Sequence, residues 1–391
     1  MACRETPRIR AASACETQSL PFWKSVDIVN LFVYPFLQRS RTMSSAMSSK
    51  SQSVYPNGET PLSMPIGCSH GPLPLDHPSL MVGKLPYFTS KLGAAYLGDS
   101  LEMLQALPSA SVNLVVTSPP YALHFKKAYG NEHKGRYVEW FLPFAKEIRR
   151  VLRDDGSFVL NIGGSYNEGM PTRSIYHFKL LIALVEEIGL HLAQECFWYN
   201  PAKMPVPAEW VTVRRVRVRD SVEYVWWLSK TPQPKASNLN VLKEYSEDMI
   251  RLNRNGVRGT VRPSGHVIRR SFDKIHAGGS IPPNVTEADF EIPESMLKMG
   301  NNAANDFYTK RCKEEGIKIH PARFPSLLPK FFIKLLTDPN DLVLDPFAGS
   351  LTAAAVAEEL DRRWIAGEAV GEYLEAGKFR FQDALQNPSL F

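Results

Sequence analysis

The chain has 391 residues, of which 44% are hydrophobic and 22% are charged, as expected for a globular protein with a full core in one or two domains. Its formal net charge of +6 is small and by itself only hints at an anionic partner. The five cysteines are scattered and no CxxC pair occurs, which argues against a disulfide framework and a metal site and favours a reducing compartment.

The N-terminal region carries no membrane-spanning pattern. Its most apolar run, residues 28–37, is shorter than the roughly 20 residues that cross a bilayer, and Pro35 interrupts it. No small-residue cleavage pattern follows closely, which disfavours a signal peptide. Residues 40–80 are rich in Ser, Pro and Met, so we expect residues 1–80 to form a poorly ordered extension. Candidate true starts are Met43, Met47, Met64 and Met81.

Alternating strand and helix patterns begin near residue 94. Strands are expected at residues 94–98, 112–117, 157–163, 195–200, 221–230, 341–347 and 363–370, and helices at residues 101–107, 136–153, 174–190, 324–336, 352–360 and 372–385. Ser100 is expected to cap the first helix. The alternation predicts a doubly wound α/β sheet. Residues 231–319 lack long periodic segments, so we expect them to form an irregular insert in this domain.

The apolar strand that ends at Thr117 leads into the motif Ser118-Pro119-Pro120-Tyr121. The two prolines fix the backbone and remove two N–H donors, so acceptors remain: the Ser118 hydroxyl and the carbonyl before Pro120. Such a corner suits a planar amino group, which brings two donors, and Tyr121 can lie against the ring that bears it. A plain Pro-Pro turn is the alternative.

Two segments concentrate arginine. Residues 213–219 contain four arginines, and as a strand they would place Arg215, Arg217 and Arg219 on one face. Residues 251–270 contain six arginines and no acid. We expect phosphate contacts here, with a solvated basic face as the alternative. Further candidates for DNA binding are Arg258, Arg262, His266 and Arg269, the last two as base readers, and Lys126 and Lys127 in a loop that closes on DNA.

Residues 341–360 contain a strand, a glycine turn and a helix in that order. Gly349 allows the turn to approach a ligand closely, while Ser350 and Thr352 lie where free N–H groups of the helix start favour an anion. The next strand ends in Glu368, a carboxylate that suits a ribose diol. Together these features indicate a nucleoside cofactor, and an ordinary βα loop is the alternative.

The SPPY motif and the DPFxGS-type turn resemble those of the S-adenosylmethionine-dependent DNA amino-methyltransferases. Ser-Pro-Pro-Tyr is typical of the cytosine-N4 enzymes, whereas adenine-N6 enzymes more often begin this motif with Asp or Asn. The catalytic motif precedes the cofactor turn, as in the beta group. The resemblance runs from about residue 84 to 385 and is greatest to PvuII-type cytosine-N4 methyltransferases, through the segments GDSLE, EYVWWLSK and GGSIPPN.

This resemblance implies a Rossmann-like methyltransferase sheet with a target-recognition insert. It implies methyl transfer from S-adenosyl-L-methionine to cytosine N4 in double-stranded DNA, by base flipping and direct in-line transfer. The enzyme would serve a restriction–modification system in the bacterial cytoplasm, beside a restriction endonuclease that it does not contact. The catalytic part would span residues 81–230, the target-recognition region residues 231–319 and the cofactor-binding part residues 320–391.

The resemblance also assigns roles to residues. Ser118, Pro119, Pro120 and Tyr121 would be catalytic; Asp345, Phe347, Gly349 and Ser350 would surround the methionine and sulfonium part of the cofactor; Glu368 would bind its ribose, Asp99 its adenine amine, and His320 would help close the pocket. Trp198 or Tyr199 would be a second stacking face for the base, or else ordinary core. Leu351 stands where family members usually have Gly or Asn, and a positive φ there would strain it by roughly 1 kcal/mol or more.

Other functions stay open at this point. Adenine-N6 methylation uses the same amine chemistry. A DNA-binding protein without catalysis is the rival that Leu351 motivates. Methylation of a protein or RNA amide is less favoured, because the basic insert suits duplex DNA. Similarity of the insert to PvuII-type enzymes implies the target sequence CAGCTG.

Overall fold

The computed structural model describes residues 76–122, 132–200, 203–255, 278–287, 307–323 and 325–381. All of them belong to one of two compact units, Leu62–Phe391, and the other unit, Met1–Pro61, lies outside the described residues. Most of the extension expected at residues 1–80 therefore lies outside them too. No helix in the described segments is long and apolar enough to cross a membrane.

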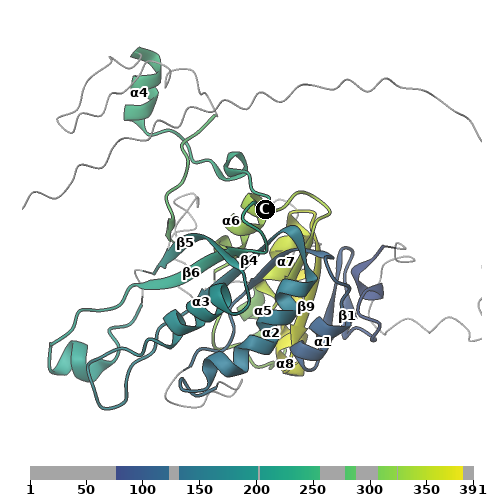
Figure 1. Ribbon diagram of the computed structural model, residues 1–391, viewed down its shortest axis with the longest axis horizontal. Helices are drawn as coiled ribbons and strands as arrows, with labels where there is room; N and C mark the ends of the chain where they lie inside the picture. The colour runs from purple at the N-terminus through teal and green to yellow at the C-terminus, as the bar shows by residue number, and fades with distance from the viewer. Residues whose placement is uncertain are drawn as a thin grey trace, which may run out of the picture. The chain divides into compact units, whose positions relative to one another are not determined.

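A mixed sheet forms the centre of this unit (Figure 1). Its strands are β1 (Phe88–Thr89), β2 (Gly93–Leu97), β3 (Val112–Thr117), β4 (Leu152–Ile162), β5 (His191–Tyr199), β6 (Val222–Ser229), β7 (Val285–Glu287), β8 (Leu342–Asp345) and β9 (Arg363–Glu368). Their order is β1-β2-β9-β8-β3-β4-β6-β5-β7. The strands from β2 to β4 in this order are parallel, and β6 runs antiparallel to both β4 and β5.

The helices are α1 (Ser100–Ala106), α2 (Tyr137–Val151), α3 (Tyr176–Glu186), α4 (Glu247–Asn255), α5 (Phe307–Glu314), α6 (Leu327–Leu336), α7 (Thr352–Glu359) and α8 (Gly371–Gly377). Short helical turns lie at Pro78–Leu80, Glu209–Val213 and Asn238–Val241. The expected helix around Pro329 forms, because this proline lies in the first turn of α6, where no helical hydrogen bond to its nitrogen is needed.

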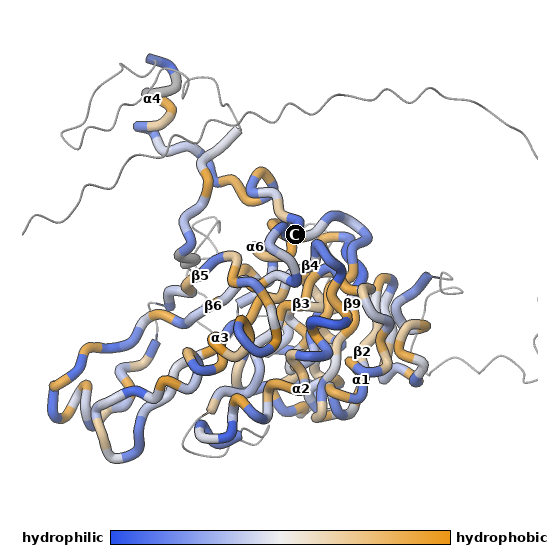
Figure 2. The backbone as a smooth tube through the Cα atoms, in the orientation of Figure 1, coloured by the Kyte–Doolittle hydropathy of each residue, from blue (hydrophilic) through white to orange (hydrophobic). Residues whose placement is uncertain are grey.

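Two hydrophobic clusters cover the two faces of the sheet. Side chains of α1, α2 and α3 pack in one cluster with Val115 of β3, and those of α6, α7 and α8 pack in the other with Leu114 and Val116. Successive residues of a strand point to opposite faces, so a strand buried on both faces is apolar throughout. Figure 2 shows hydrophobic residues gathered along the central strands. The predicted doubly wound α/β class is confirmed.

Two local expectations were wrong. The strand expected at residues 157–163 begins at Leu152, directly after α2, and contains Gly156, where a side chain would meet the backbone oxygens of Arg153 and Val112. Helix α1 is capped by the side chain of Asp99, whose carboxylate accepts from the Leu101 N–H at 2.8 Å. Ser100 is the first helical residue, and its hydroxyl donates to the backbone oxygen of Pro346.

The chain leaves neighbouring strands β8 and β3 in opposite directions. After β8 it passes through α7 to β9 on one side, and after β3 it passes through α2 to β4 on the other. Such a switch point opens a crevice at the carboxyl ends of the strands, where α/β proteins bind ligands. The division into catalytic, target-recognition and cofactor-binding parts stays a prediction.

Candidate functional site

Thr117 ends β3 and Asp345 ends β8, and a hydrogen bond joins them at the switch point. The Thr117 Oγ1 donates to Asp345 Oδ1 at 2.6 Å, and the same oxygen accepts from the backbone N–H of Phe347 at 3.1 Å. Both Thr117 and Asp345 are buried. Burial, with a smaller contribution from the nearby charge of Glu368, raises the pKa of Asp345 to about 7. This contact brings the SPPY motif and the glycine turn to one place.

The glycine turn after β8 is held by Glu368 at the end of β9. One Glu368 oxygen accepts from the Gly349 N–H at 2.8 Å and the other from the Val370 N–H at 2.9 Å. Burial raises the pKa of Glu368. Gly349 has a φ of 51°, and a Cβ there would lie 3.1 Å from the His320 Nε2. Glu368, Gly349 and His320 are therefore neighbours, although the chain separates the histidine widely from the other two.

His320 is held edge-on to Tyr373, with 4.4 Å between the ring centres. Its Nδ1 accepts from the Ala322 N–H at 3.3 Å. Burial is the main cause that lowers the pKa of His320 to about 4, so its ring is neutral at physiological pH.

Three other residues of the expected cofactor site, Phe347, Ser350 and Thr352, are held by contacts with neighbouring side chains. Phe347 packs among Trp140, Phe141 and Phe144, with ring centres 5.2–6.2 Å away. The Ser350 and Thr352 hydroxyls lie 3.2 Å apart at the start of α7. Arg380 donates to the backbone oxygen of Ser350 at 2.7 Å and to its hydroxyl at 3.2 Å. Sequence reasoning missed Arg380, because no local pattern links it to the turn.

Leu351 adopts the left-handed conformation that its position was suspected to require, with φ 60° and ψ 29°. Its side chain is fully buried and lies against Gly377 in α8, where a Cβ would come within 2.6 Å of the leucine Cδ1. The missing side chain at Gly377 makes room for the leucine. Packing thus accommodates a residue that the backbone conformation disfavours.

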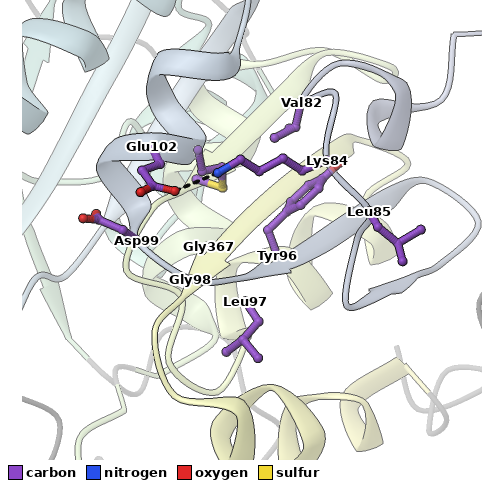
Figure 3. A pocket seen from close by; sticks show the side chains of 10 residues that line it. Val82, Lys84, Leu85, Tyr96, Leu97, Gly98, Asp99, Glu102 and Gly367 are labelled. Carbon is purple, nitrogen blue, oxygen red and sulfur yellow. Dashed lines mark hydrogen bonds and ion pairs between the residues drawn. The ribbon is translucent and has the colours of Figure 1, made fainter.

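A pocket opens beside the ends of β2 and β9 and the start of α1 (Figure 3). Asp99 lines it together with Tyr96, Gly98 and Gly367. The Lys84 Nζ lies 2.8 Å from a Glu102 oxygen across this pocket. Asp99 is exposed, and besides its bond to α1 its carboxylate has no partner among the described residues. It can therefore accept a hydrogen bond from a ligand.

The side chains of the SPPY motif are bound to neighbouring strands. The Tyr121 hydroxyl lies 2.9 Å from Glu223 Oε2, 3.0 Å from Asn161 Nδ2 and 3.3 Å from the Ser118 Oγ. Burial, and then the negative charge of Glu223, raises the pKa of Tyr121 well above its usual value. The Tyr121 ring lies against Gly163, where a Cβ would come within 2.4 Å of the ring atom Cε2. Pro119 is buried, and the Pro120 carbonyl accepts from Tyr137 Oη at 2.8 Å.

Sequence reasoning missed Asn161 and Glu223. Asn161 is the penultimate residue of β4 and is 3% exposed, and Glu223 is the second residue of β6 and is 8% exposed. The one available signal was a polar residue within an otherwise apolar strand. Besides its contact with Tyr121, Glu223 forms an ion pair with Lys203, with 3.0 Å between Nζ and Oε1. Trp198 is buried in the core, so Tyr199 is the remaining candidate for a second stacking face.

Residues 213–219 do not form a strand, so Arg215, Arg217 and Arg219 do not share a strand face. A helical turn covers Glu209–Val213, and an irregular segment follows, with Arg215 at a φ of 54°. Arg217 donates to the Pro171 carbonyl at 2.7 Å and lies over the Tyr166 ring, and Arg219 donates to the Lys203 carbonyl at 3.4 Å. Arg215 is exposed and has no partner within the described segments.

The other expected DNA contacts lie outside the described residues: Arg258, Arg262, His266, Arg269, Lys126 and Lys127. No group of histidine, cysteine, aspartate and glutamate side chains in the described segments is arranged to hold a metal ion.

Comparison with known proteins places these features in a common context. The N6/N4 methyltransferase family, described as DNA methylase, matches residues 112–379. The Type II methyltransferase M.PvuII of Proteus hauseri is 48% identical over 307 residues, which cover 78% of this chain and 88% of that protein. M.BglII of Bacillus subtilis is 26% identical over 73% of this chain and 67% of its own length. The solved structure of PvuII DNA methyltransferase (cytosine-N4-specific) superposes with a TM-score of 0.61 at 43% identity, covering 77% of this chain and 90% of that one.

The buried Asp345 makes stability depend on pH. Its folded pKa of about 7 exceeds the unfolded value of about 4, so the folded state binds the proton more tightly than the unfolded chain. The wild type should therefore lose stability as pH rises from about 4 to about 7. Asp345→Asn keeps an acceptor but cannot ionise, and it should lack this loss. Thermal unfolding without ligands between about pH 5 and about pH 8 compares the two. Parallel pH profiles would contradict the assignment.

Leu351 and Gly377 should be energetically coupled. Leu351→Gly relieves backbone strain of about 1–2 kcal/mol but removes a buried side chain worth about 2–5 kcal/mol. We expect a net fall of about 1–3 kcal/mol in the free energy of unfolding, measured by urea denaturation. Gly377→Ala should destabilise the wild type, because its Cβ meets Leu351, and should be less harmful in the Leu351→Gly background. Higher stability of Leu351→Gly than of the wild type would refute this account.

Proposed function

Because this chain belongs to the N6/N4 DNA methylase family, we propose that it methylates the exocyclic N4 of cytosine in double-stranded DNA. The methyl donor is S-adenosyl-L-methionine, and the enzyme modifies the DNA of a restriction–modification system in the bacterial cytoplasm. The restriction endonuclease of that system acts separately. The observation that carries the proposal is the Thr117–Asp345 hydrogen bond, which joins an amine-binding motif to a cofactor-type turn.

The residues at the switch point fit this cofactor. S-adenosylmethionine, when bound, supplies a methyl group made electrophilic by a sulfonium cation. A buried carboxylate such as Asp345, whose pKa is raised by burial, suits a cationic neighbour. Asp99, which lines the pocket of Figure 3, would bind the adenine amine, and Glu368, next to the lining residue Gly367, would bind the ribose hydroxyls. A Cβ at Gly349 would lie 3.1 Å from the His320 Nε2, so the glycine lets the His320 ring lie against this turn.

The SPPY corner would prepare the amine. The lone pair of the cytosine amine is delocalised into the ring, so the amine is a poor nucleophile. Acceptors at the Ser118 hydroxyl and the Pro119 carbonyl would draw its N–H bonds out of the ring plane and expose the lone pair. The base must leave the duplex to reach this corner, and Tyr121 would lie against it. Direct displacement then depends mainly on positioning.

DNA would lie across the irregular segment that carries the arginines. Arg215 is exposed, so it can contact phosphate, whereas Arg217 is held by the Pro171 carbonyl and by Tyr166. Arg219 is exposed and stays a candidate. The candidates in the basic stretch 251–270, and Lys126 and Lys127, stay predictions from sequence.

The product identifies the reaction. We expect isotopically labelled methyl groups to appear in N4-methylcytosine after incubation with DNA, detected by mass spectrometry of the nucleosides. Sequencing with modification detection should locate them, with CAGCTG as the expected site. Label found only in N6-methyladenine would overturn the proposal, and no transfer of label would favour a non-catalytic DNA-binding protein.

Ser118→Ala should separate chemistry from binding. Loss of one acceptor that acts on the amine should lower turnover by about 100-fold, a magnitude typical of a group that acts in the transition state. Cofactor affinity, measured by isothermal titration calorimetry, should stay unchanged, because Ser118 is not part of the turn at Gly349. Full methyl transfer by this variant would remove the proposed role of the hydroxyl.

Arg215→Ala should weaken DNA binding through one phosphate. The slope of log affinity against log salt concentration should become shallower by about 0.9. Arg214→Ala is the matched control, because Arg214 is paired with Glu209 at 2.6 Å and lies over Trp210. Its slope should change less. Equal slopes for Arg215→Ala and the wild type would show that Arg215 does not contact phosphate.

A further inference from the structure

Glu223 is a buried carboxylate with two bound partners and no assigned role. Its Oε2 lies 2.9 Å from the Tyr121 hydroxyl, and its Oε1 lies 3.0 Å from the Lys203 ammonium. An ionised carboxylate can only accept hydrogen bonds. The Tyr121 hydroxyl must therefore donate its single proton to Glu223. Toward its other neighbours the Tyr121 oxygen can only accept hydrogen bonds.

The acceptor role of the Tyr121 oxygen fixes the direction of the hydrogen bonds that it forms with its other neighbours. The Tyr121 oxygen can accept two hydrogen bonds, and two donors lie within reach: Asn161 Nδ2 at 3.0 Å and the Ser118 hydroxyl at 3.3 Å. The Asn161 amide nitrogen faces the two hydroxyls, and its Oδ1 has no partner in the described part of the chain. The Ser118 proton thus points toward Tyr121.

What remains on Ser118 is a lone pair. The Ser118 hydroxyl donates its proton to Tyr121, and its oxygen accepts a hydrogen bond from Asn161 Nδ2 at 3.4 Å. One of the two lone pairs of this oxygen therefore stays free to accept another hydrogen bond. A group that reaches this open position must bring an N–H or O–H donor. A carbonyl oxygen in the same place would meet a lone pair without a proton between them, which is unfavourable.

We propose that Glu223 is a positioning residue that makes Ser118 an obligatory acceptor, and that it thereby selects an amino group over a carbonyl at C4 of the flipped pyrimidine. This inference rests on the proposed function and adds the origin of base selection. Cytosine carries an amine at C4 and uracil a carbonyl, so the two bases differ in the one group that the corner reads. Glu223 touches neither base, and it acts through Tyr121.

The test is Glu223→Gln, measured on DNA binding without cofactor. The Lys203 ammonium should donate to the amide oxygen of the glutamine, and the amide nitrogen then faces Tyr121. Tyr121 then donates to Ser118, and the Ser118 proton turns to the open side. The wild type should bind duplexes with cytosine at the target position more tightly than duplexes with uracil. In Glu223→Gln this preference should fall by about tenfold, and turnover on cytosine should fall with unchanged cofactor affinity.

A double variant controls for simple damage. In Lys203→Met/Glu223→Gln no ammonium competes for the amide oxygen, so that oxygen can accept from Tyr121 again and the preference for cytosine should return. Lys203→Met alone should keep the preference, because Glu223 remains an acceptor. Thermal unfolding shows whether each variant is folded. If Glu223→Gln does not fold, Tyr121→Phe is the substitute, because it removes the acceptor for Ser118 and should also reduce the preference.

Two results would overturn the inference: an unchanged preference in folded Glu223→Gln, or no recovery in the double variant. Failure of the proposed function is recognised separately, because the wild type would then form no N4-methylcytosine.

Discussion

The site depends on one hydrogen bond between the ends of two neighbouring strands. Thr117 and Asp345 are 228 residues apart in the chain, yet their side chains meet at 2.6 Å because β3 and β8 pair in parallel. This contact fixes the distance between the SPPY motif and the glycine turn, for which we propose amine binding and cofactor binding. In-line transfer tolerates little misplacement, so a short bond between buried groups is a suitable anchor.

The sequence predicted the layers and the two motifs well, because both rest on local signals. Apolar strands and a glycine turn are readable from spacing, and the resemblance supplied the roles that we propose for Ser118 and Glu368. The partners of these motifs were not predictable. Glu223 and Arg380 reach the site only through the pairing of strands and the packing of helices far along the chain. The alternation of Val and Arg in residues 213–219 suits a strand, but the segment is irregular and Arg215 has a positive φ.

Three buried carboxylates accept hydrogen bonds around the switch point. The carboxylates of Asp345, Glu368 and Glu223 are all buried, and each accepts hydrogen bonds from neutral groups or from Lys203. Buried acceptors of this kind hold donors in one orientation, because reversing a bond would leave two lone pairs facing each other. The site is thus preorganised by buried acceptors, both at the turn and at the SPPY motif.

The order of the strands also constrains how the chain is made. Strands β8 and β9 come last in the sequence, yet they lie between β2 and β3 in the sheet. Until the ribosome has released residues 342–368, β2 and β3 have no neighbour on their facing edges. The emerging polypeptide therefore carries open apolar edges for most of its synthesis, and the sheet closes only after nearly the whole chain has been translated. A nascent fragment that lacks β8 also lacks the Thr117–Asp345 bond, so the SPPY motif and the glycine turn come together only near the end of translation.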